Sequence, residues 1–126
     1  MPHALGYLLV FVGGGLGATA RHAVGRAGLA LLGPGFPWWT MAVNVAGSFA
    51  IGLLAGLFGA FETGPNARLF LTTGFLGGFT TFSAFSLDAL TLWERGAALQ
   101  AGLYVAGSVI ASLIAAFAGL MASRLA

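Results

Sequence analysis

Long apolar runs separated by short polar interruptions dominate the pattern of this sequence. Four stretches contain no charged residue: 4–20, 27–61, 69–87 and 96–123. A helix needs about 20 apolar residues to cross the hydrocarbon core of a bilayer, so each run can supply one span. The second run is longer than one span, but the segment 33–37 (Gly-Pro-Gly-Phe-Pro) interrupts it. The pattern therefore predicts four transmembrane helices, at about residues 5–24, 38–61, 67–93 and 97–121.

Composition places the chain in the same class. Of its 126 residues, 59% are hydrophobic and only 6% are charged, which is far from the composition of soluble globular proteins. We expect a single all-α membrane domain over residues 1–126, with the first helix retained because no basic residue precedes its apolar run. The absence of cysteine excludes disulfides and thiolate metal sites. The few charges also exclude a nucleic-acid surface, which needs a basic stripe.

The third span carries an unusual interruption. Gly77-Gly78 is followed closely by Thr80-Thr81, inside a run without charge. Glycine pairs weaken a helix, and irregular backbone at membrane depth is tolerated only where it is buried in protein or lines a cavity. The sequence therefore predicts a helix break over residues 77–81 at mid-membrane, which divides the third span into two half-helices.

Polar side chains recur at helical spacing in two other spans. They are Thr40, Asn44 and Ser48 in the second, and Tyr104, Ser108 and Ser112 in the fourth. A four-residue interval places each set on one face of its helix. Two interpretations stay open for these stripes: hydrogen bonds between helices, or a polar path for a solute.

Several further positions have structural and functional interpretations. The glycines of 13–17 favour a close helix–helix contact over contact with a solute. Arg21 lies near the far end of the predicted first span, where an arginine either extends to the interface or neutralises a group inside the protein. Phe82, Phe85 and Asp88 share one face beyond the break. Arg21 and Asp88 lie toward the same side of the membrane, so an ion pair between them is a hypothesis.

The arginines are nearly balanced between the two sides of the membrane. Arg68 and Arg124 fall on one side, and Arg21, Arg26 and Arg95 fall on the other. Orientation follows Lys/Arg asymmetry, so we predict insertion in both orientations and an antiparallel homodimer. A two-fold axis in the membrane plane would bring two breaks together. Freed carbonyls there suit a hard cation, whereas helix N-termini suit an anion.

Three stretches resemble the Fluc (CrcB) fluoride-channel family. They are the block 74–85 (Gly-Phe-Leu-Gly-Gly-Phe-Thr-Thr-Phe-Ser-Ala-Phe), the glycine-rich 13–18 with Arg21, and 44–48 (Asn-Val-Ala-Gly-Ser). The resemblance covers essentially the whole chain, and the block in the third helix is its most specific part. It implies a dual-topology homodimer with two antiparallel pores in the inner (plasma) membrane, which exports fluoride passively and relieves fluoride toxicity.

The resemblance also implies roles for single residues. A structural Na⁺ at the dimer centre would be held by the backbone carbonyls of Gly77 and Thr80. Arg21 would lie in a vestibule, and His22 stands where tyrosine is common in the family. The implied anion pathway comprises Asn44, Phe82, Ser83, Phe85, Tyr104, Ser108 and Ser112.

Other classes of protein fit less well. A small dual-topology, proton-coupled multidrug exporter is the main alternative, but it needs an intramembrane carboxylate. The first span has none, and Asp88 lies beyond the break. A scaffold protein would not need the break. An enzyme is not expected, because two histidines and three scattered acids offer no acid–base pair or metal cluster.

Overall fold

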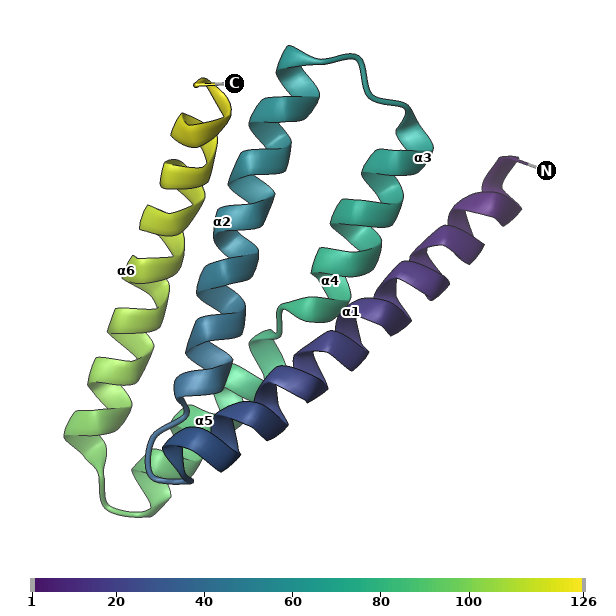
Figure 1. The fold of residues 1–126 in the computed structure, drawn as a ribbon. Coiled ribbons are helices and arrows are strands. Elements are labelled where there is room, and N and C mark those ends of the chain that lie inside the picture. The colour runs from purple at the N-terminus through teal and green to yellow at the C-terminus, as the bar shows by residue number, and fades with distance from the viewer. Residues whose placement is uncertain (1, 126) are drawn as a thin grey trace.

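The computed structural model describes residues 2–125, and their regular secondary structure is all helical (Figure 1). The elements in chain order are α1 (Pro2–Leu32), α2 (Trp38–Ala60), α3 (Pro65–Arg68), the π-helix η1 (Leu69–Leu76), α4 (Gly77–Phe79), α5 (Phe82–Glu94) and α6 (Ala98–Ser123). Four helical stretches are long and apolar enough to cross a membrane, and α3 to α5 together form the third of them. The prediction of an all-α membrane protein with an interrupted third span is confirmed.

The first helix is longer than the sequence pattern predicts. It continues past residue 24 to Leu32 and ends before Gly33, whose φ of 75° lies in the left-handed region that favours glycine. At 1.5 Å per residue α1 is about 46 Å long, well beyond the hydrocarbon thickness of about 30 Å. Figure 1 shows α1 running diagonally across the other helices. Arg21 and Arg26 therefore lie inside the helix and not at its end.

Two helix pairs are held together by close backbone approach. α2 and α6 lie side by side (Figure 1), and a Cβ at Gly52 would collide with the Ala116 backbone. α1 packs against η1 and α4, where a Cβ at Gly17 would collide with the Phe75 carbonyl. The prediction that the glycines of the first span form a packing face is confirmed for Gly13 and Gly17. Small residues at such contacts allow van der Waals packing in lipid.

The break in the third span occupies only the last two residues of the predicted range 77–81. Gly77 to Phe79 stay helical, and the backbone becomes extended at Thr80 and Thr81, with ψ of 156° and 123°. Gly78 is needed for contact with the Gly14 backbone in α1, which accounts for a glycine there without a break. β-Branched threonine tolerates extended backbone well, and the Thr81 hydroxyl accepts the Ala84 N–H (3.1 Å) as the N-cap of α5.

Candidate functional site

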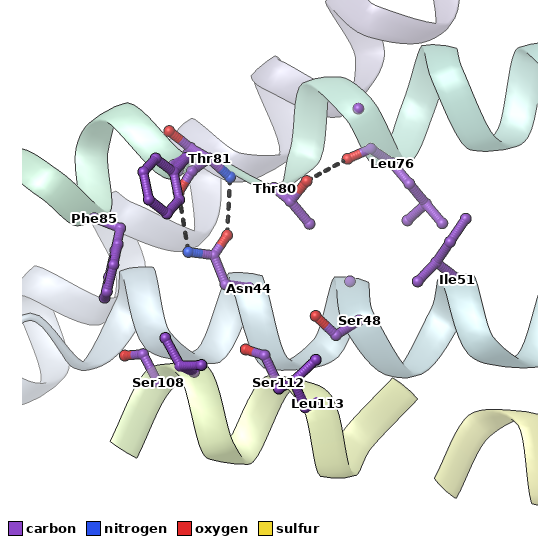
Figure 2. Close-up of a pocket in the computed structure, with 14 residues that line it drawn as sticks. Asn44, Ser48, Ile51, Leu76, Thr80, Thr81, Phe85, Ser108, Ser112 and Leu113 are labelled. Carbon is purple, nitrogen blue, oxygen red and sulfur yellow. Dashed lines mark hydrogen bonds between the residues drawn. The ribbon is translucent and has the colours of Figure 1, made fainter. Parts of the chain in front are cut away.

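The Asn44 side chain of α2 holds the break in place. The Thr81 N–H donates to Asn44 Oδ1 (2.8 Å), and Asn44 Nδ2 donates to the Thr81 carbonyl (3.0 Å). Figure 2 shows this pair of bonds spanning the space between α2 and the break. Buried backbone N–H and C=O groups need partners, and the break removes the helical ones. Asn44 Oδ1 therefore replaces the helical acceptor that the Thr81 N–H has lost, and Nδ2 adds a second bond to the carbonyl that opens α5.

The break also leaves carbonyls at the end of α4 without their usual donors. In a continuous helix the Thr81 N–H would donate to the Gly77 carbonyl, but here it donates to Asn44. The Gly78 carbonyl instead accepts from Arg21 Nε (3.1 Å). The C-terminal end of α4 thus carries partial negative charge, whereas the N-terminal end of α5 carries partial positive charge.

A cavity of about 460 Å³ lies between the break and α6, and we call it the central cavity. Its lining includes seven predicted site residues: Asn44, Gly77, Thr80, Phe82, Phe85, Ser108 and Ser112. Ser48 and Thr81 add further polar groups to it. Figure 2 shows side chains from α2, the broken span and α6 converging on this space. None of the lining side chains carries a formal charge.

Ser108 has an unsatisfied hydroxyl. Its side chain is only 4% exposed, and its Oγ has no hydrogen-bond partner within residues 2–125. A buried polar group without a partner is costly, so the rare examples in native structures require an explanation. A ligand that accepts a hydrogen bond in the central cavity would provide one.

Phe82 and Phe85 lie together at one side of the central cavity. Their ring centroids are 5.5 Å apart, but Phe82 is 78% exposed whereas Phe85 is 8% exposed. Phe85 is packed inside the chain, against Tyr104 (5.2 Å between ring centroids). Phe82 therefore lies on the open side of the cavity, where a single chain provides no cover.

Two residues of the expected anion pathway do not line the central cavity. Tyr104 is fully buried, and its hydroxyl donates to Asp88 Oδ2 (3.0 Å) while Phe36 packs edge-on against its ring. Ser83 is exposed at the start of α5, with its Oγ 3.4 Å from Thr81 Oγ1. Of the fourth-span stripe, only Ser108 and Ser112 line the cavity.

Within residues 2–125 Arg21 and Asp88 form no ion pair, so the hypothesis that they pair is wrong. Arg21 donates to the Gly78 carbonyl, and Asp88 accepts from Tyr104. Arg21 therefore binds a backbone carbonyl inside the protein.

A second cavity, of about 310 Å³, contains Arg21 and is named here the basic cavity. Its lining side chains come from α1, α2 and α5: Arg21, His22, Gly25, Arg26, Leu29, Trp39, Thr40, Val43, Thr81 and Ala84. Thr81 lines both cavities, so the break forms part of the wall between them. No Asp or Glu lines the basic cavity among residues 2–125.

Thr81 and Thr40 contribute more than the sequence indicated. Thr81 links Asn44, the α5 cap and both cavities, whereas the sequence marked it only as part of the break. Thr40 belongs to the second-span stripe but lines the basic cavity, away from Ser48. The available signal for Thr81 was its place directly before a helix start, where threonine is a favoured cap.

A broken span beside a largely apolar, uncharged cavity that also presents hydroxyls and an amide is typical of membrane proteins of the ion-conducting class. The chain belongs to the CrcB family: the family model described as CrcB-like protein, Camphor Resistance (CrcB), matches residues 8–120. It is therefore a multi-pass protein of the inner membrane.

Relatives from three bacteria carry the name fluoride-specific ion channel FluC. The one from Sphingopyxis alaskensis is 56% identical over 116 residues, which are 91% of this chain and 92% of the relative. Those from Mesorhizobium japonicum and Rhizobium etli are 54% and 56% identical, each over 93% of this chain and 94% of the relative. The family resemblance predicted from the sequence is confirmed.

Proposed function

We propose that this chain is the subunit of a fluoride-selective channel, which lets fluoride leave the cell passively and so relieves fluoride toxicity. The observation that carries the proposal is the central cavity, where phenylalanine rings, hydroxyls and an amide surround the positive end of a half-helix. The name of its relatives supports the same activity.

The lining of the central cavity suits a small anion that sheds part of its hydration. The edge of an aromatic ring is electropositive, so Phe82 and Phe85 offer weak anion contacts. Among residues 2–125 the Ser108 hydroxyl has no partner to which it donates, and Asn44 Nδ2 has a second N–H beyond the one given to Thr81. The absence of a fixed charge keeps each contact weak, and conduction requires that an ion leave as readily as it enters.

An antiparallel homodimer would complete the site. The central cavity is open where Phe82 is exposed, and polar groups facing lipid are costly, so a second copy is the natural cover. Arg68 and Arg124 lie toward one side of the membrane, and Arg21, Arg26 and Arg95 lie toward the other. This near balance supports insertion in both orientations, and hence two antiparallel pores.

The end of α4 fits a structural Na⁺ at the dimer centre. Gly77 and Thr80 line the open central cavity, and the Gly77 carbonyl has lost its helical donor to Asn44. Carbonyl oxygens are suitable ligands for a hard cation, and the C-terminal end of a helix favours positive charge. Two copies would bring these carbonyls together, so the ion would stabilise the dimer.

Fluoride efflux from liposomes that contain the purified chain tests the proposed activity. A fluoride electrode should record rapid efflux once a potassium ionophore balances the charge, and chloride should not follow at a comparable rate. No fluoride flux, or equal chloride flux, would refute selectivity. A flux that required a proton gradient would favour the proton-coupled multidrug exporter. That alternative needs a carboxylate in the membrane, but Asp88 is bonded to Tyr104 and lies outside both cavities.

Single cysteines in the turn 62–66 test the dual orientation. The chain has no native cysteine, so an impermeant maleimide reports only the introduced one. We expect about half of the molecules to be labelled from each side of the membrane. Labelling from one side alone would show a single orientation and would contradict the antiparallel dimer.

A further inference from the structure

The basic cavity gathers positive charge that the chain itself does not balance. Arg21, His22 and Arg26 lie on adjacent turns of α1 and all line it. Arg21 uses only Nε, for the Gly78 carbonyl, which leaves its two Nη groups available. Within residues 2–125 Arg26 has neither a hydrogen-bond nor an ion-pair partner, and no carboxylate lines the cavity.

The start of α2 adds to this positive character, because Trp39 and Thr40 lie in its first turn. At the start of α5 the Ala84 N–H is already bound by the Thr81 hydroxyl. α2 has no side-chain cap, so the N–H groups of its first turn lack the partner that a capping side chain gives. Helix N-termini carry partial positive charge and bind phosphate and related anions.

The basic cavity has room for an ion larger than a halide. Its volume of about 310 Å³ is roughly ten times the share of liquid volume that one water occupies, about 30 Å³. It differs from the central cavity in charge, because two arginines line it whereas no charged side chain lines the central cavity. A tetrahedral oxyanion has several acceptor oxygens, and arginine binds them with two parallel N–H donors.

We propose that the basic cavity binds a phosphate-class oxyanion, either inorganic phosphate or the phosphate of an anionic lipid headgroup. Arg26 and the Nη groups of Arg21 would bind its oxygens, and His22 would donate a further hydrogen bond. The site needs only one chain, so the proposal does not depend on fluoride conduction. An occupant would lie against Thr81, next to the break.

Calorimetric titration of the full-length protein in a neutral detergent tests binding of free phosphate. Sodium phosphate is compared with sodium chloride at equal Na⁺ concentration. Arg26→Gln should weaken phosphate binding by at least about tenfold, because a hydrogen bond to a charged group is worth about 1.5–3 kcal/mol and 1.4 kcal/mol is tenfold. Arg95→Gln is the matched control, since Arg95 is exposed, lies at the same end of the helices and is absent from the cavity.

Native mass spectrometry with phosphatidylglycerol and phosphatidylcholine tests the lipid source. Retention of phosphatidylglycerol that is lost in Arg26→Gln and kept in Arg95→Gln, without binding of free phosphate, would assign the site to a lipid headgroup. Binding of free phosphate with the same variant pattern would assign it to the soluble ion. The proposal would be overturned if neither phosphatidylglycerol nor free phosphate bound, or if Arg26→Gln and Arg95→Gln had equal effects. Either result would count against it whether or not the protein conducts fluoride.

Discussion

Replacing Asn44 with alanine removes the amide that holds the break in the third span. Two hydrogen bonds to Thr81 are lost, at 2.8 and 3.0 Å, and the Thr81 N–H and carbonyl lose these partners. Hydrogen bonds between membrane helices average about 0.6 kcal/mol, which puts the lower bound near 1 kcal/mol for the pair. Leaving the buried Thr81 N–H unpaired costs about 1–3 kcal/mol, which puts the upper bound near 3 kcal/mol. The Thr81 carbonyl is not left unpaired, because as the N-cap of α5 it also accepts the first hydrogen bond of that helix.

The structure indicates how the variant would respond to this loss. Without Asn44, the Thr81 N–H can return to the Gly77 carbonyl, its partner in a continuous helix. The third span would then straighten, and the central cavity would lose both the α5 N-terminus and the freed carbonyl. We expect fluoride flux to fall at least about tenfold, which corresponds to 1.4 kcal/mol and lies inside the range above.

Flux and assembly must be measured on the same preparation. Fluoride efflux from liposomes gives the rate, and size-exclusion chromatography in detergent gives the oligomeric state before and after the substitution. Ser48→Ala is the matched control, because Ser48 lies one turn away on α2 and lines the same cavity without contacting the break. Wild-type flux and thermal stability in Asn44→Ala would refute the reasoning, as would an equal loss in Ser48→Ala.

Two further pairs of substitutions test the packing described above. Gly17→Ala should lower the unfolding midpoint in detergent, by the equivalent of about 1–3 kcal/mol, because its Cβ would collide with the Phe75 carbonyl. Gly15→Ala, whose Cβ meets nothing within 4 Å, should leave the midpoint unchanged or raise it. Phe85→Ala should destabilise the fold by about 3–5 kcal/mol, since Phe85 is 8% exposed. Phe82→Ala, at a position that is 78% exposed, should keep the fold and reduce fluoride flux. A similar loss of stability in Phe82→Ala and Phe85→Ala would contradict these different roles.

The four spans could be predicted from the sequence because they depend only on the length and hydropathy of each run. The end of the first helix could not be predicted in the same way. Arg21 and Arg26 suggested a membrane edge, but a helix stops where its backbone is interrupted, and that happens only at Gly33-Pro34. A charged residue indicates where a span approaches water, but the helix continues until its backbone is interrupted.

The position of the break shows a second limit of sequence analysis. The Gly77-Gly78 pair suggested the weak point, but Gly78 is required by its contact with α1, and the backbone departs from the helix at Thr80. Asn44 and Thr81 are separated by 37 residues, and no local pattern links them. The sequence could therefore identify Asn44 as important without showing that its partner is the backbone of another helix.

Helical spacing predicted correctly which hydroxyl side chains share one face of α6. Ser108 and Ser112 share a face of α6 and line the central cavity together. Tyr104 lies on the same face, one turn before Ser108, but it is outside the cavity. Its hydroxyl binds Asp88, and its ring packs against Phe36. Spacing predicts which residues share a face, and the neighbouring helices determine what that face contacts.

The bond between Asn44 and Thr81 also bears on the order in which the chain assembles. The helix that carries Asn44 is synthesised before the one that it bends, so the amide is already in the bilayer when Thr81 arrives. Until the two helices meet, Thr81 can satisfy its N–H only by continuing the helix. The third span would thus enter the bilayer straight and bend only when α2 docks against it, as a step of folding within the membrane.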